Sequence, residues 1–354
     1  MATLGSGALI SGLSYLGVGR ETAYGTYTTA PAGLPFISAS LKTMKESKII
    51  EQVTTSRTYT QNMRISRVVE GDLEFYFQPR LSACAFLLGS GFGVTNASAA
   101  TATGETAGAG AASAMDYTYN LGEFNGSYPS LCINLRKGPT TTGKIFEYSG
   151  ARVDEIMFSA ELDDALKCTT SLVFKDSTVT TNDISAAVLP GTSTVLSFED
   201  GRVSVESSVA SLTSATFWHV QSCEFGWSNS LKKDSEARRI GSDTLVVLPA
   251  GMASFTLNLS LRFDTTTAYD AMINNTQFSA ELNFAGPTLP SSSIRQRLKM
   301  TFPKIFVSDA GDPEIGGADE ILKSEVAFHV LRDDSSATGY AVQAVLTTNI
   351  QSMT

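Results

Sequence analysis

Apolar and polar residues alternate with a period of two along much of this chain, and that pattern restricts the fold more than any other feature. The clearest run is SFTLNLSLRF at residues 254–263, and GDLEFYFQP at residues 71–79 repeats the pattern. Successive side chains of a β-strand point to opposite faces of its sheet, so alternation indicates antiparallel sheets with one buried face. The sequence therefore predicts a mainly β protein, built as a sandwich or half-barrel.

Two more alternating runs, at residues 151–162 and 166–176, flank the residues DDA and predict a β-hairpin. Helical segments are few. QPRLSACAFLLGS has a proline near its start and a glycine near its end, and DTTTAYDAMINN begins with Asp264, a good N-cap. We expect one short helix in each half of the chain.

The order of elements occurs twice: a basic arm, a strand, a short helix and a late hairpin. Such a repeat predicts an internal duplication. We place domain 1 at residues 1–199, with an N-terminal arm, and domain 2 at residues 200–354. Domain 1 also holds an Ala/Thr/Gly-rich segment at residues 95–116, whose composition cannot build a core and predicts a flexible or extended loop.

Each half carries a long basic arm or hairpin loop, although the chain has a net charge of −9. The candidate contact residues are Lys42, Lys45, Lys48, Arg57, Arg64, Lys232, Lys233, Arg238 and Arg239, with Arg67 beside the first set. Solvated loops, nucleic-acid binding and protein contact are the three interpretations. The acidic net charge and the lack of interleaved aromatic residues disfavour nucleic acid. Complementary charge between copies sets register in an assembly, which favours protein contact.

The sequence predicts no catalytic, cofactor or metal site. Its two histidines, His219 and His329, alternate with apolar neighbours, and the four cysteines are widely spaced with no CxxC pair. We expect buried free thiols in a reducing compartment. The segment at residues 309–320 lacks the ligand spacing of a calcium loop. No run is long enough to span a membrane and the start does not resemble a signal peptide, so we expect a chain made in a cytoplasm, without membrane contact.

Several segments together resemble one protein family. A G-x-E-x-x-Y-G-T core is formed by Gly19, Glu21, Tyr24, Gly25 and Thr26. It looks like the entry of many siphophage major tail tube proteins. GDLEFYFQPRLSACAFLLGSGFG resembles that family's strand, short helix and Gly-rich exit, and FEYSGARVDEIMFSAELDDALKCTTSLVFKD resembles its paired strands after a Y-S-G turn. LKMTFPKIFVSD and the strand after it resemble the late strands of the family.

This resemblance implies a structural subunit rather than an enzyme. Tube domains of the family are β-sandwiches or half-barrels; six of them close a ring, and rings stack into a hollow tube in the virion tail. The implied partners are other copies, a tape measure protein, a tail terminator, distal tail or baseplate proteins, and DNA that passes without specific binding. Assembly would take place in the host cytoplasm. A chain with two domains implies a trimeric ring with pseudo-sixfold symmetry.

Within that tube, the basic arms are expected to make contacts between rings. Carboxylates facing the channel would repel phosphates and let DNA slide. The candidates for the lumen are Asp72, Glu74, Asp154 and Glu155.

Two other function classes remain open on the sequence. One is an interaction protein, such as a virion decoration or tail-fibre-type β-domain. The other is a β-sandwich enzyme or carbohydrate-binding module, which needs clustered carboxylates or exposed tryptophans in a groove. The chain has only Trp218 and Trp227, and the sequence shows no paired acids in a credible cleft. The low fraction of charged residues, 17%, against about 25% in typical soluble domains, indicates that other copies cover much of the surface.

Overall fold

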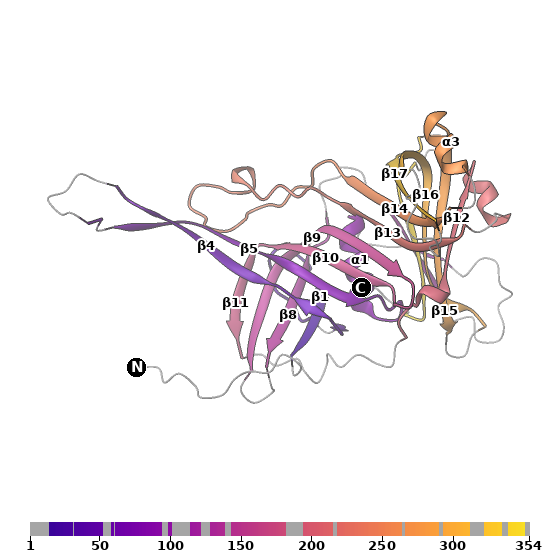
Figure 1. Cartoon of the computed structure of the whole chain (residues 1–354). Coiled ribbons are helices and arrows are strands. Elements are labelled where there is room, and N and C mark those ends of the chain that lie inside the picture. Colours follow the sequence, from indigo (N-terminus) through magenta and orange to yellow (C-terminus); the bar gives the residue numbers. More distant parts are fainter. Residues whose placement is uncertain are drawn as a thin grey trace.

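The alternating runs form antiparallel strands, so the predicted mainly β fold is confirmed (Figure 1). The structure, a computed structural model, describes residues 14–30, 32–51, 58–59, 61–93, 98–100, 114–121, 128–138, 143–181, 194–214, 218–263, 266–289, 293–311, 322–334 and 339–350. The run at residues 254–263 becomes β14 (Ser254–Arg262). Its Leu257 and Leu259 are buried and Asn258 is exposed, as the alternation requires.

The first half supplies one group of strands. Its members are β1 (Tyr15–Arg20), β2 (Ala32–Leu34), β3 (Ser38–Ala39), β4 (Lys42–Ile49), β5 (Asn62–Tyr76), β8 (Leu131–Lys137), β9 (Lys144–Glu161), β10 (Lys167–Phe174) and β11 (Asp176–Thr180). The predicted hairpin is present as β9 and β10, with Lys167 opposite Ser159. The neighbours in one layer are β3 and β4, then β5, β10 and β9. The long strand β9 continues into a second layer, where it pairs with β8 and β11, and β8 pairs with β1.

The second half repeats these pairings. Its strands are β12 (Gly201–Glu206), β13 (Val220–Ser228), β14, β15 (Gln277–Thr288), β16 (Arg295–Ala310), β17 (Lys323–Leu331) and β18 (Gln343–Thr348). The order β13, β14, β17, β16 matches β3–β4, β5, β10, β9. The long strand β16 also pairs with β15 and β18, just as β9 pairs with β8 and β11. The strand β15 pairs in turn with β12, just as β8 pairs with β1. The domain boundary between residues 199 and 200 stays a prediction.

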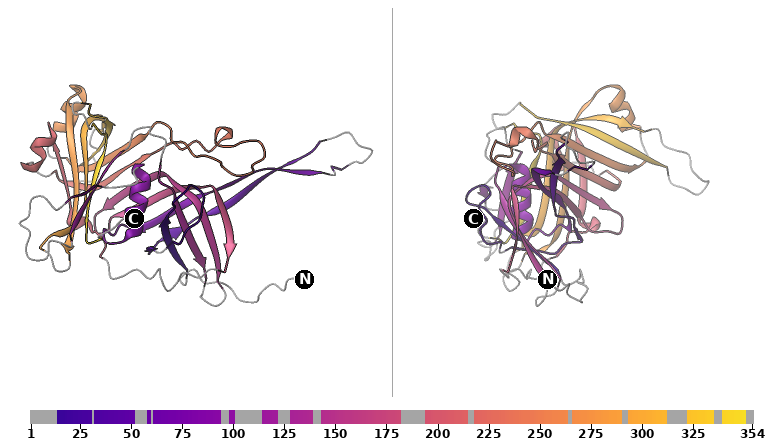
Figure 2. Two further views of the ribbon diagram at one scale, coloured as in Figure 1. Left: turned by 180° about the vertical axis from the view of Figure 1, so that it is seen from behind. Right: turned by 90° about the vertical axis from the view of Figure 1, so that its left-hand side faces the viewer.

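The two groups are joined edge to edge by β9 and β13. The pairing runs from Glu161 opposite Ser222 to Glu155 opposite Ser228, so one sheet continues from the first half into the second (Figures 1 and 2). A second link joins the halves: β7 (Met115–Asn120), from the first half, pairs with β18 near the end of the chain. Within the Ala/Thr/Gly-rich segment, β6 (Ser98–Ala100) pairs with β7, and residues 101–113 lie outside the described ranges.

The core lies behind the joined sheet and spans both halves. Helix α1 (Ser82–Phe92) ends at Gly93, whose φ of 70° lies in the left-handed region that glycine favours. The helix packs against β9, and the indole of the buried Trp227 on β13 donates a hydrogen bond of 2.9 Å to the carbonyl of Gly91. Each half thus holds the expected short helix, the second being α3 (Thr267–Ile273), although Asp264 lies outside the described residues.

Short helical turns complete the described elements: the 3-10 helices η3 (Phe198–Asp200), η4 (Val209–Ser214) and η5 (Ser235–Ala237). No described helix has both the length and the apolar content needed to cross a membrane. All four cysteines are buried free thiols, as predicted, and burial raises the pKa of Cys84 and of Cys223 to about 12.

The two basic arms differ in structure. The first arm (residues 42–67) is a long two-stranded hairpin of β4 and the start of β5, and it projects far from the body (Figures 1 and 2). The second arm (residues 229–253) connects β13 to β14, contains only η5 as regular structure, and extends over the first half in the same direction. The second arm is buried in part because Leu231, Ala237, Leu245 and Leu248 pack with Val173 of β10.

Candidate functional site: an acidic sheet face and two basic arms

One face of the joined sheet is solvent-exposed and acidic. On β5, Leu73 and Phe75 point into the core, so Asp72 and Glu74 lie on the opposite face. Residues opposite each other on neighbouring strands share a face, so the register carries this face across the sheet. One row of partners is Lys167, Ser159, Glu224, Asn258, Ala327 and Asp309; the next is Glu161, Ser222, Ser260 and Glu325.

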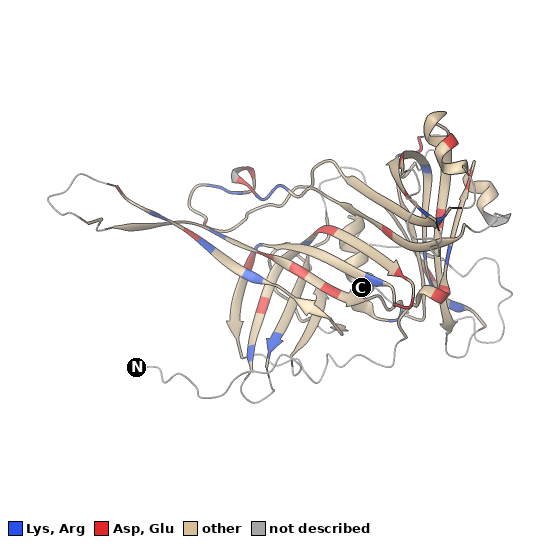
Figure 3. Cartoon of the chain, viewed as in Figure 1, with Lys and Arg blue, Asp and Glu red and all other residues tan. Residues whose placement is uncertain are grey.

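This acidic face is defined by Asp72, Glu74, Glu155, Glu161, Glu224, Asp309 and Glu325. The basic residues among these carboxylates are Lys167, Arg262 and Lys323, and Lys167 is already paired with Asp164 at 2.8 Å. Beyond the bulges of β9 and β16, Arg152 and Lys304 also lie on this side of the sheet, and Arg152 donates to the second arm. Acidic side chains therefore outnumber basic ones on the face, and Figure 3 shows them along several strands of the sheet.

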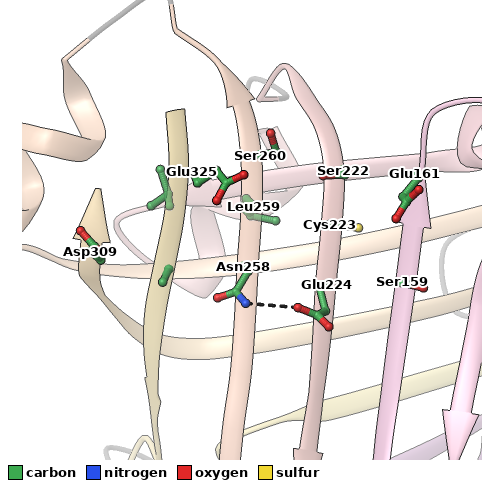
Figure 4. A pocket seen from close by; sticks show the side chains of 12 residues that line it. Ser159, Glu161, Ser222, Cys223, Glu224, Asn258, Leu259, Ser260, Asp309 and Glu325 are labelled. Atoms are coloured by element: carbon green, nitrogen blue, oxygen red, sulfur yellow. Dashed lines mark hydrogen bonds between the residues drawn. The ribbon is translucent and has the colours of Figure 1, made fainter. Parts of the chain in front are cut away.

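The face is hollowed where the two halves meet. A depression of about 480 Å³ is lined by strands β9, β13, β14, β17 and β16, with carboxylates at Glu161, Glu224, Asp309 and Glu325 (Figure 4). Asn258 donates a hydrogen bond of 3.3 Å to Glu224. Across the described ranges, no group of three or more His, Cys, Asp and Glu side chains is placed to hold a metal ion. The depression offers spread negative charge, and its other lining residues are small or uncharged.

Hydroxyl groups occupy much of the remaining face. Ser171 donates a hydrogen bond of 2.7 Å to Asp72, and Ser38 donates one of 3.1 Å to Glu74. These donors orient the carboxylates without cancelling their charge. A polyanion passing over such a surface meets repulsion and few cations to bind.

The four residues proposed for a lumen do not all lie on this face. The structure places Asp72, Glu74 and Glu155 there. Asp154 instead occupies a β-bulge of β9, where its Oδ1 accepts a hydrogen bond of 2.8 Å from the backbone N–H of Leu231. The carboxylate of Asp154 thus holds the second arm against the sheet.

Sequence reasoning did not select Glu161, Glu224, Asp309 and Glu325. Each occupies a polar position of an alternating strand, but only the register between distant strands brings them together. Alternation alone could have assigned them to an exposed face, without showing that this was the face of Asp72.

The first arm presents a row of exposed side chains on β4. Every residue of β4 is exposed, including Lys42, Lys45 and Lys48, and Lys45 lies opposite Arg67. The Arg67 guanidinium pairs with Asp176 at 2.7 Å, at the base of the arm. Arg57 lies outside the described residues. The backbone of Arg64 pairs with Ser47, and its side chain is not described.

The second arm uses one of its cations within the chain. Lys233 pairs with Glu70 of β5 at 2.9 Å, whereas Lys232 and Arg239 are exposed and Arg238 is half-buried. The arm is also held by its backbone, because the N–H of Arg67 donates to the carbonyl of Asp243 at 2.9 Å. The contact of these four cations with other copies of the chain stays a prediction.

The motif near the start of the chain builds a clamp. The Glu21 carboxylate accepts hydrogen bonds from the backbone N–H of Gly25 at 2.8 Å and of Gly150 at 2.7 Å. Burial raises the pKa of Glu21, because the cost of desolvating the charged form exceeds the effect of these hydrogen bonds. Both glycines have positive φ, 74° and 66°. The motif thus fixes the loop after β1 against the bend of β9.

A comparison with models of known protein families gives an extended match. A family model described as "Phage tail tube protein" matches residues 12–330. A search of curated proteins found no match. A solved structure titled "Crystal structure of Hcp protein" is 10% identical, covers 37% of this chain and 86% of its own, and has a TM-score of 0.25, which is too low to support an inference.

Proposed function

The chain belongs to the phage tail tube protein family, and on that premise we propose that three copies close a ring of six similar units, and that such rings stack into a DNA-conducting tube. The family makes the chain a structural subunit of a phage tail tube and a component of the virion tail.

The junction between β9 and β13 carries this proposal. It joins two groups of strands with the same order within one chain, β3–β4, β5, β10, β9 and β13, β14, β17, β16. These groups would be the cores of two tandem domains, at residues 1–199 and 200–354. A junction that connects two similar units head to tail can be repeated by the next unit, and it closes a ring when the rotation allows.

Two unpaired strand edges could form the same kind of junction with another copy. In the described ranges, β3 and β4 pair only with β5, which leaves their outer edge free. The pairing of β15 with β16 ends at Phe306, so the outer edge of β16 from Val307 to Ala310 is free within the described part as well. By analogy with β9 and β13, β16 of one copy would pair with β3–β4 of the next. Closure of the ring would cover edges that otherwise promote uncontrolled pairing.

The acidic face would line the channel. Its concave part lies at the junction of the halves, and the opposite face of the sheet is the hydrophobic core. A lining of carboxylates and hydroxyls would repel phosphates, so DNA would pass without specific binding. A tape measure protein would fill the channel before ejection, and tail terminator and distal tail or baseplate proteins would close the two ends.

The arms would couple the units. The first arm extends well beyond the body and carries cations along its whole length, which suits contact with acidic surface on another copy. We place the protein in the long, siphophage class of tails, assembled in the host cytoplasm, with no catalytic role.

Cryo-electron microscopy of the assembled protein tests the proposal. We expect rings of three chains with six similar densities around a channel lined by the acidic face. Six chains per ring, or a lumen lined mainly by Lys and Arg, would refute it. Failure of the purified chain to form rings or tubes at any concentration would contradict the function itself.

A further inference from the structure

The second arm covers a specific site on the first half. The backbone N–H of Arg67 donates to Asp243, and the Arg152 guanidinium donates to the carbonyl of Leu248. Val173 is buried by four apolar side chains of the arm, Leu231, Ala237, Leu245 and Leu248. The covered site therefore lies where the start of β5, the middle of β9 and the end of β10 meet.

The repeat of strands defines the matching site on the second half. Both long strands carry a bulge at the same place in the ladder, at Asp154 in β9 and at Ser308 in β16. Counting from the bulges gives the equivalents: Arg152 corresponds to Phe306, Val173 to His329, and Arg67 to Ala253.

In the second half this matching site is open. A hollow of about 530 Å³ is lined by Ala253, Ser254, Phe255, Asn275, Phe306, His329, Val330 and Leu331. Its members include all three equivalents of the residues covered in the first half. Among the described residues none fills it, and the side chain of Leu331 is 46% exposed. An apolar hollow left open in one unit and covered in its repeat indicates an occupant that the single chain does not supply.

The repeat also identifies the segment that corresponds to the second arm. β13 precedes the second arm, and Ser222 on β13 has the place of Ser38 on β3. The chain that follows Ser38 is the first arm. It projects away from the second half of its own chain (Figure 1), and it carries exposed apolar side chains at Met44, Met63 and Ile65.

We propose that the first arm of one copy docks in the hollow at Phe255, Phe306 and Leu331 of the preceding copy, the one whose β16 pairs with its β3–β4, as the second arm docks on the first half within a chain. This inference rests on the proposed ring function. It assigns the apolar side chains of the first arm to a site on a neighbouring chain, with the lysines of β4 at its rim. Every unit of the ring would then be covered by the arm of the unit that follows it.

Photo-crosslinking between isotopically distinct chains tests this docking. Chains labelled with ¹⁵N carry Ile65→p-benzoylphenylalanine, are mixed with unlabelled chains, assembled and irradiated, and crosslinked peptides are identified by mass spectrometry. We expect peptides that join position 65 of a labelled chain to residues 251–263, 293–311 or 322–334 of an unlabelled one. Leu331→Glu in the unlabelled chain should lower their yield by about tenfold or more, because a carboxylate would be buried without a partner.

Val179→Glu is the matched control, since Val179 is also an exposed apolar strand residue, at 65% exposure, and lies on β11 away from the hollow. It should leave the yield unchanged. Rings that form with crosslinks confined to other surfaces, or a yield unaffected by Leu331→Glu, would overturn the docking and leave the tube function standing. Absence of any assembly would instead remove the ring on which the docking depends.

Discussion

Glu21 accepts a hydrogen bond of 2.7 Å from the backbone N–H of Gly150, which ties the first loop of the chain to the bend of β9. The same carboxylate binds the N–H of Gly25, so one side chain satisfies two backbone donors. Because β9 belongs to both layers, this clamp supports the strand that carries the junction to β13.

Glu21→Ala should lower the free energy of unfolding by about 1–3 kcal/mol, because the amides of Gly25 and Gly150 lose their acceptor. A carboxyl whose pKa is raised by folding contributes most below its unfolded pKa, and the contribution is lost as pH rises through the folded pKa. The difference between wild type and variant should therefore shrink from about pH 4 to pH 7. Urea unfolding across this range measures it, with the exposed Glu199→Ala as control. A difference that widens with pH would contradict the raised pKa.

Gly226→Ala should open the junction between β9 and β13. A Cβ at Gly226 would lie 2.2 Å from the carbonyl oxygen of Ile156, so the two backbones would have to separate. We expect a loss of about 1–3 kcal/mol in unfolding free energy. Gly311→Ala is the matched control, because its nearest atom, the carbonyl oxygen of Glu325, is 3.8 Å away. Equal stability of both variants would show that the junction tolerates a shift.

Charge reversal on the acidic face should make assembled tubes retain DNA. The double variant Glu161→Lys with Glu224→Lys places cations in the depression, so binding of short DNA should appear and weaken steeply as salt is raised. Wild-type tubes should bind none. Glu199→Lys with Glu206→Lys carries the same change in charge away from the face. Fluorescence anisotropy at several salt concentrations gives the result, and equal DNA binding by the two variants would argue against a channel face.

Lys232→Glu and Lys233→Glu should have different effects. Lys233 already pairs with Glu70 in the same chain, a partly exposed ion pair worth about 0.2–1 kcal/mol, so its reversal should loosen the second arm slightly. Lys232 is exposed and is the cation we expect to contact another copy. Its reversal should shorten tubes in negative-stain images without changing the unfolding midpoint. Tubes of normal length would exclude Lys232 from the contact.

Strands and hairpins could be predicted from the sequence where a single continuous segment determines them. Alternation at residues 254–263 predicted β14, and the DDA turn predicted the hairpin of β9 and β10, because both depend on neighbouring residues. The pairing of β7 with β18 was not foreseen, since alternation does not identify a partner more than two hundred residues away.

The candidate site also depends on features that the alternation of a single strand does not reveal. Asp154 and Glu155 were proposed together for the lumen, but a bulge turns Asp154 toward Leu231. A bulge inserts one residue into the ladder and interrupts the alternation from which facing was inferred. Glu224 and Glu325 share a face with Glu161 only through register between separate strands, which single-strand patterns do not contain.

The junction of β9 and β13 is made within one polypeptide, so its strands stay tethered at any dilution, whereas a junction between copies depends on concentration. In a ring of three chains every second junction would be tethered in this way. Ring closure would then require encounters among three bodies rather than six, and less translational freedom would be lost on assembly. A tube that dissociates would shed two-unit arcs, each ready to start a new ring.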